Sequence, residues 1–153
     1  MIQRIQTLYL LLAAAALALA LQLPWGTFFA PDGSAYVYKA FAVEQQVGEG
    51  ALSISFWALG VVLCVAGLLS LATVFFFKKR MLQARFCIFG ELILIGYYLV
   101  YVLFMFLTKS RLEARFGLGY GTALPFVAMV LIYLALRAIL KDEQKARAYE
   151  RIR

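Results

Sequence analysis

The residue of this sequence whose chemistry is least expected is Glu91. It stands in the apolar stretch CIFGELILIGYY, residues 87–98, as the only carboxylic acid there. A carboxylate costs about 2.5–3.5 kcal/mol or more at the centre of a bilayer, so such an acid calls for a partner or a function. Arg137 lies near the end of another apolar stretch, and a guanidinium group can bind both oxygens of a carboxylate. The pattern predicts an ion pair between Glu91 and Arg137, at equal height on antiparallel helices.

Further polar side chains are expected around this pair. Tyr98 follows Glu91 by seven residues and Tyr133 precedes Arg137 by four, so each shares a helix face with its charged neighbour. Gln6 and Tyr9 stand at the start of the first apolar stretch, at the same end of the bundle. We therefore predict a buried polar cluster that consists of Glu91, Arg137, Tyr98, Tyr133, Gln6 and Tyr9.

The role of this predicted cluster is open between several interpretations. The pair could fix the register of two helices, or it could form a protonatable or ligand-binding site. Glu91 could instead reach Lys79 or Arg85, or be protonated and unpaired.

The residues that most enzymes depend on are scarce. Histidine is absent and only two cysteines occur, which removes the commonest metal and haem ligands and the usual general base. Cys64 and Cys87 are expected at depths about 18 Å apart, too far for a disulfide, so we interpret both as small buried residues. We predict no catalytic residue, no cofactor and no metal site, and we expect that the protein is not an enzyme.

The composition indicates a membrane protein, because 65% of the residues are hydrophobic and only 15% are charged. The apolar residues form runs long enough to cross a bilayer, and such runs must be helical because lipid cannot satisfy an open backbone. We predict one all-α domain, residues 1–153, built as a bundle of four transmembrane helices with a helical tail at 141–153. The spans are expected at about 5–23, 51–77, 86–107 and 122–140.

The net charge of +7 is distributed unequally between the two sides of such a bundle. The positive-inside rule therefore places both termini in the cytoplasm, where the basic residues would meet anionic lipid headgroups rather than nucleic acid. Of the 15 basic residues, only Lys39, Lys109, Arg111 and Arg115 fall on the opposite side.

The first connection, residues 24–50, is the longest and is expected to face outward. Pro31-Asp32-Gly33 indicates a turn, and the flanking stretches 25–29 and 35–43 suit a short extracytoplasmic β-hairpin between the first two helices. Trp25, Tyr36 and Tyr38 would lie at the bilayer interface. The hairpin could be a lid over the helix ends or a docking edge for a partner.

The third connection, TKSRLEARFGLGYG, contains three glycines. No strand precedes it in the predicted fold and a membrane helix follows it, so a phosphate-binding loop is excluded. We interpret the glycines as allowing a sharp turn before Pro125.

The opening MIQRIQTLYLLLAAAALAL, the connection KKRMLQARFC and the ending LPFVAMVLIYLALRAILKDEQKARAYERIR resemble an uncharacterised family of small bacterial four-span inner-membrane proteins, known as a domain of unknown function. The resemblance covers the whole chain. It implies a four-helix protein of the bacterial inner membrane, and it implies no activity, cofactor or catalytic residue.

Two functions are compatible with these observations. The first is a non-enzymatic accessory or scaffolding component that contacts another membrane protein, or a second copy of itself, through the hairpin or the tail. The alternative is a small transport or ligand-binding bundle that uses the cluster around Glu91 and Arg137.

Overall fold

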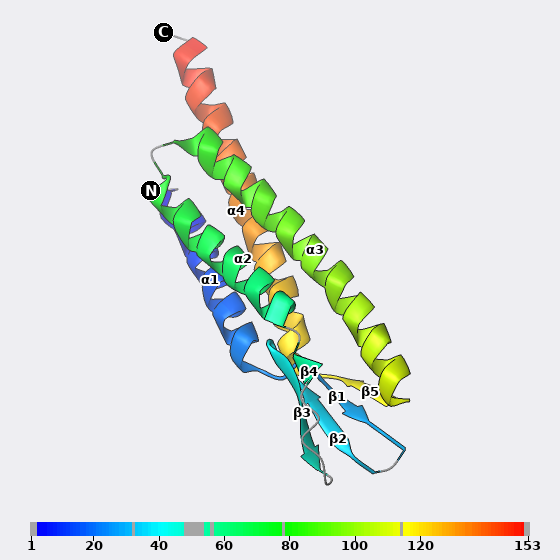
Figure 1. The fold of residues 1–153 in the computed structure, drawn as a ribbon. Coiled ribbons are helices and arrows are strands. Elements are labelled where there is room, and N and C mark those ends of the chain that lie inside the picture. The colour runs from blue at the N-terminus through cyan, green and yellow to red at the C-terminus, as the bar shows by residue number, and fades with distance from the viewer. Residues whose placement is uncertain are drawn as a thin grey trace.

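The computed structural model describes residues 3–31, 33–47, 54–55, 57–77, 79–113 and 115–151. Within these ranges, four helices are long and apolar enough to cross a membrane, and a small sheet lies at one end of the bundle that they form (Figure 1). The helices are α1 (Gln3–Gln22), α2 (Trp57–Phe75), α3 (Arg80–Leu112) and α4 (Ala123–Arg151), and the 3₁₀ turn η1 (Tyr120–Thr122) leads into α4.

The four helices pack as an antiparallel ring in which α1 contacts α2 and α4, and α3 contacts the same two helices. Small residues occupy the middle of this ring, where they allow the helix backbones to approach closely. Those that are fully buried are Ala13, Ala20, Ala66, Ala128 and Ala135.

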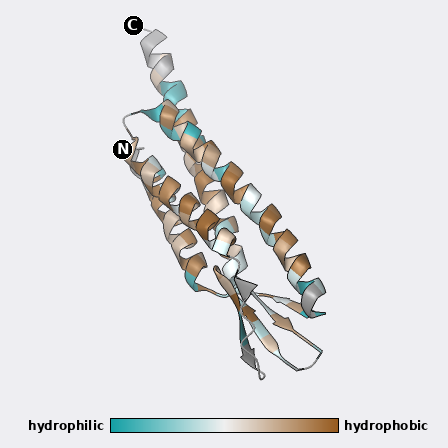
Figure 2. Ribbon diagram, in the orientation of Figure 1, coloured by the Kyte–Doolittle hydropathy of each residue, from teal (hydrophilic) through white to brown (hydrophobic). Residues whose placement is uncertain are grey.

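Large apolar side chains are exposed along the helices of the ring. Figure 2 shows that most of the length of these helices is hydrophobic. Leu19, Leu68, Leu99 and Phe106 are all more than half exposed. Soluble monomers rarely expose continuous apolar surface of this extent, so the outer face suits lipid.

The predicted helices agree with the structure best at the two ends of the chain. Helix α1 matches the first predicted span, and α4 continues without a break from the fourth span through the tail to Arg151. Helix α2 begins at Trp57, later than predicted, because Ile54–Ser55 forms a strand. The remaining positions of 51–56 lie outside the described residues.

Helix α3 is longer than its predicted span of 86–107 at both ends. Its first turns contain Arg80, Gln83 and Arg85, residue types with good helix propensity but low hydropathy. A span predicted from apolar runs therefore ends where the hydropathy falls, whereas the helix itself continues through these polar residues.

The sheet is larger than the predicted hairpin. It has five antiparallel strands in the order β4-β3-β2-β1-β5: β1 (Gly26–Phe29), β2 (Ala35–Tyr38), β3 (Ala42–Val47), β4 (Ile54–Ser55) and β5 (Arg115–Leu118). The expected hairpin is β1–β2, paired from Gly26↔Tyr38 to Phe29↔Ala35. An all-α bundle with one hairpin is thus an incomplete description of this fold.

Two parts of the sheet differ from the prediction. One is a break within a predicted strand, and the other is an additional strand from a distant part of the chain. The stretch 35–43 was expected to be one strand, but it turns after Tyr38 and continues as β3. Strand β5 comes from the glycine-rich third connection and pairs with β1, almost 90 residues earlier in the chain. A strand of only four residues that pairs with a segment so distant in the sequence is hard to recognise from local sequence.

Candidate functional site

The register between α3 and α4 decides whether Glu91 and Arg137 can meet. Arg80 Nη1 donates a hydrogen bond to the carbonyl oxygen of Asp142 over 3.4 Å, and Tyr98 Oη donates to the carbonyl oxygen of Thr122 over 2.8 Å. Between these contacts, a Cβ added to Gly90 would lie 3.8 Å from Ile132 Cδ1.

This register places the two charged residues in different layers. The position of α4 that is level with Glu91 is near Leu131, so Arg137 lies about six residues, or about 9 Å, closer to the chain termini. The predicted equal height is therefore wrong. That prediction assumed that the apolar runs end at the same level, near 86 and 140, and the packed helices are shifted from this by about one turn.

The expected ion pair is not formed among the described residues. Glu91 is half-buried, and its buried Oε1 has no hydrogen-bond partner there. Arg137 is exposed and borders a groove between α1 and α4 together with Tyr9. Any functional role of the two residues stays a prediction.

The other members of the predicted cluster are also dispersed. The bond of Tyr98 to Thr122 places it at the start of α4, and the side chain of Tyr133 is 51% exposed on the outer face. Gln6 is buried, but its partner is Asp142. Of the six predicted residues, Tyr9 and Arg137 line one groove, and Gln6 is hydrogen-bonded to Asp142 of the same lining.

A buried contact between Gln6, Asp142 and Arg80 is present instead, and it joins three helices. Gln6 Nε2 donates to Asp142 Oδ2, and Arg80 donates to the backbone carbonyl of the same aspartate. Gln6 is 4% exposed and Asp142 is 9% exposed.

The sequence contains a signal for this contact. Asp142 continues the buried positions Ile132, Ala135 and Ile139 at the spacing of one helix face. Extending that periodicity beyond the apolar run would have predicted burial of Asp142. From the sequence, residues 141–153 are predicted only as a helical tail, because their composition is polar.

Trp25 forms the junction between the sheet and the helices. Its ring is fully buried, its Nε1 donates to the carbonyl oxygen of Ala20 at the end of α1 over 2.7 Å, and its backbone N–H donates to Tyr38 of β2 over 2.7 Å. Its carbonyl oxygen accepts hydrogen bonds from Thr122 Oγ1 over 2.5 Å and from Tyr101 Oη over 3.3 Å. We call these contacts the Trp25 junction.

Aromatic rings fill the space around this junction. The ring of Trp25 makes edge contacts with Tyr38, Tyr97 and Tyr101 at centroid distances of 5.6, 5.6 and 6.1 Å. Such contacts stabilise by about 0.5–1.5 kcal/mol each beyond area burial. Burial, followed by the neighbouring Tyr101, raises the pKa of Tyr38 above its usual range, so the phenol stays neutral in the folded protein.

The expected interfacial role of Trp25, Tyr36 and Tyr38 is therefore wrong, because all three side chains are buried inside the protein. Their amphipathic character is used within the fold, where the sheet covers the helix ends. Sequence alone could not distinguish these two uses, since an aromatic ring with a polar group suits a bilayer interface and a protein junction equally.

Gly119 allows the third connection to reach this junction. Its N–H donates to the carbonyl oxygen of Trp25 over 3.0 Å. A Cβ at this position would lie 2.6 Å from the carbonyl oxygen of Pro24. This oxygen belongs to the backbone and cannot move away as a flexible side chain could. The glycine is thus needed for close approach of two backbones and not only for a turn.

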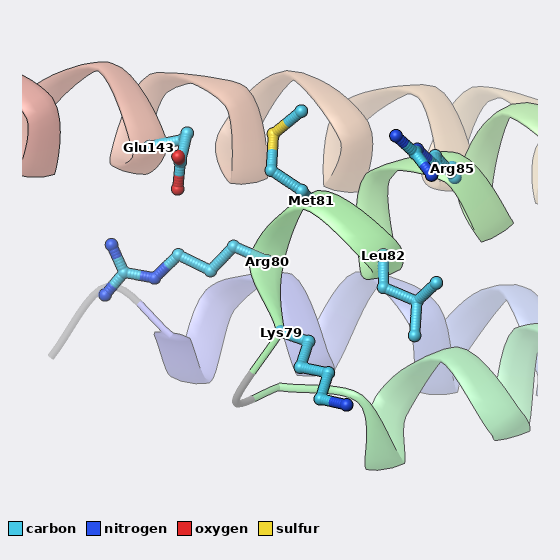
Figure 3. A pocket seen from close by; sticks show the side chains of 6 residues that line it. All are labelled: Lys79, Arg80, Met81, Leu82, Arg85 and Glu143. Atoms are coloured by element: carbon cyan, nitrogen blue, oxygen red, sulfur yellow. The ribbon is translucent and has the colours of Figure 1, made fainter.

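Basic side chains gather at the opposite end of the bundle, near the chain termini. An open pocket of about 630 Å³ at the turn between α2 and α3 is lined by Lys79, Arg80, Met81, Leu82, Arg85 and Glu143. Figure 3 shows that Lys79 and Arg85 point in different directions and that Arg80 extends on the side of Glu143. The basic side chains there point away from one another and do not converge on one binding point.

The chemistry of these sites is limited. Cys64 and Cys87 are both free, and no group of three or more His, Cys, Asp or Glu residues within the described ranges could hold a metal ion. Four apolar helices with an apolar outer face, joined to a small antiparallel sheet, point to the class of helical membrane proteins.

The chain belongs to the family described as a domain of unknown function, DUF4293, whose model matches residues 2–152. This confirms the resemblance to an uncharacterised family noted in the sequence. None of the curated proteins matches the chain.

Proposed function

We propose that this protein is a non-enzymatic integral membrane scaffold that holds a rigid β-sheet at one membrane surface for contact with another membrane protein. The observation that carries this proposal is the Trp25 junction. It joins the end of α1, strand β2, helix α3 and the turn before α4 through hydrogen bonds to one residue. A lid without a further role would not require attachment to so many elements.

The edge of the sheet at β5 is the proposed contact surface. In the described sheet this strand is terminal and pairs only with β1. Leu118 in β5 is 78% exposed, and Tyr120 and Phe29 nearby are also exposed. An open strand edge can accept a partner strand, and apolar side chains beside the helix ends suit a partner that is itself in the membrane.

The distribution of charge supports a cytoplasmic location of both termini in a bacterial inner membrane, with the sheet on the extracytoplasmic side. The sheet end of the bundle has few cations, and Lys39 there forms an ion pair with Glu44, with 2.6 Å between Nζ and Oε2. The cations near the termini include Lys79, Arg80, Arg85, Arg137, Lys141 and Lys145.

The alternative, a transport or ligand-binding bundle, has one observation in its favour, which is the unpartnered Oε1 of Glu91. The packing of the bundle weakens it. The layers on either side of Glu91 contain Cys87, Leu94 and Ile132, all of them buried, and these apolar side chains offer a transported polar solute no partners.

Photo-crosslinking in native membranes tests the scaffold. A photoreactive amino acid at position 118 is expected to capture a discrete partner protein. The same probe at position 99 should capture lipid, because Leu99 is similarly exposed, at 70%, but lies on the outer face of α3. Lipid adducts alone at both positions, or capture only of a second copy of the chain, would contradict the proposed role.

A further inference from the structure

The groove between α1 and α4 at the end of the bundle near the chain termini has no role in the scaffold. It is open and has a volume of about 710 Å³. Along α4 its lining runs from Leu134 to Lys145, about 16 Å of helix. Within this stretch, Leu134, Arg137, Lys141 and Lys145 recur at spacings of three or four residues and so share one helix face. Ile5 and Tyr9 of α1 form the opposite wall.

The solvent-accessible charge in the lining of this groove is positive. Arg137, Lys141 and Lys145 line it at intervals of four residues and are all exposed. Asp142 is the acid in the lining, but it is nine-tenths buried and its carboxylate accepts the hydrogen bond from Gln6. The accessible charges are therefore a column of cations.

The floor of the groove is apolar and joins the lipid-suited surface of the helices. Ile5, Leu134 and Leu140 are in its lining and are each more than one-third exposed. Leu134 lies deeper in the bundle than the cations, and Lys145 lies farthest out along α4. A ligand that fits this gradient has an anionic group at one end and an apolar group at the other.

We propose that this groove binds one anionic phospholipid, with the phosphate headgroup at Arg137 and Lys141 and the acyl chains along Ile5 and Leu134. Basic residues near a membrane surface attract anionic lipids by about 1 kcal/mol each, and a guanidinium group matches the geometry of a phosphate. The apolar floor favours the lipid over a soluble phosphate. The site does not depend on the scaffold, so the two proposals can fail separately.

The pocket at the turn between α2 and α3 provides the comparison. It has a similar number of cations, but its accessible lining includes the acid Glu143, and its basic side chains diverge (Figure 3). General attraction of the bilayer surface would act on both places equally. A specific site predicts that lipid retention depends on the groove alone.

Native mass spectrometry of the full-length protein in mild detergent tests this difference with phosphatidylglycerol as the probe. The variant with Arg137→Gln and Lys141→Gln is expected to bind this lipid at least about tenfold more weakly. The control with Lys79→Gln and Arg85→Gln removes the same charge from the same end and should stay within about threefold of the wild type. Phosphatidylcholine with identical acyl chains should bind weakly to all three proteins.

A second variant keeps the charge and fills the space. Ala138→Phe, in the middle of the groove lining, is expected to reduce phosphatidylglycerol binding while the melting temperature shows that the protein is folded. Equal loss in both charge variants, unchanged binding in the groove variants, or displacement of the lipid by inorganic phosphate would overturn the proposal.

Discussion

At the scale of single residues, Glu91 is a carboxyl group inside an apolar helix without the cation that was expected to compensate it. Arg137 lies about one and a half turns away along the bundle axis and faces α1. A buried polar contact at the same end of the bundle, Gln6 with Asp142, uses a residue from the polar tail instead. At this end, Gln6 and Asp142 stabilise the packing of α1 on α4, and the hydrogen bond from Arg80 to the backbone carbonyl of Asp142 connects α3 to α4 without Glu91.

A double-mutant cycle on Glu91→Gln and Arg137→Gln is expected to show no coupling. Each single change should alter the free energy of unfolding in micelles by less than about 1 kcal/mol, with a coupling energy below about 0.5 kcal/mol. A formed buried pair would instead lose about 3–5 kcal/mol when one partner is removed.

The positive control is the cycle on Gln6→Leu and Asp142→Leu, where a coupling of about 1 kcal/mol or more is expected because the two side chains are in contact. A coupling above about 1 kcal/mol between Glu91 and Arg137 would mean that the two side chains do pair in the membrane.

At the scale of elements, the sheet depends on contacts that join the first and third connections. Strand β5 pairs with β1, and the N–H groups of Gly119 and Gly121 donate to the carbonyl oxygens of Trp25 and Pro24. These contacts hold the connection between α3 and α4 against the segment that follows α1. The sheet therefore links the connection between α1 and α2 to the connection between α3 and α4 at this end of the bundle.

Two glycine substitutions should affect stability with opposite signs. Gly119→Ala is expected to lower the free energy of unfolding by about 1–3 kcal/mol, because the new Cβ would press on backbone. Gly96→Ala on α3 meets nothing within 4 Å and should raise it by about 0.5–1 kcal/mol through helix propensity. Thermal melts of the two variants provide the measurement, and a neutral Gly119→Ala would contradict the close approach.

At the scale of the whole molecule, the ring of four antiparallel helices puts the sheet at one end and the chain termini at the other (Figure 1). The termini end has the basic groove and the basic turn, whereas the sheet end has few cations. The proposed orientation follows from this asymmetry together with the positive-inside rule.

Cysteine accessibility in intact cells tests the orientation. In a background with Cys64→Ala and Cys87→Ala, a membrane-impermeant maleimide should label Lys39→Cys directly and Lys145→Cys only after the inner membrane is permeabilised. Both positions have exposed side chains at opposite ends of the bundle. Immediate labelling at position 145 with protection at 39 would reverse the proposed topology.

The sequence by itself determined the number of long apolar helices, the continuation of the last helix through the tail, the β1–β2 hairpin and the family. These features depend on local composition: apolar runs of bilayer length, the helix propensity of the residues after Leu140, and a turn that places Gly33 at a φ of 82°.

Only the tertiary structure decided the register of α3 on α4, the burial of Asp142, the pairing of β5 with β1 and the junction at Trp25. Each depends on which residues distant in sequence come into contact, and a shift of about one helical turn leaves local composition unchanged while it places Glu91 and Arg137 in different layers of the bundle. Hydropathy determines how long a helix is. Side-chain packing between the helices determines which residues are level with one another.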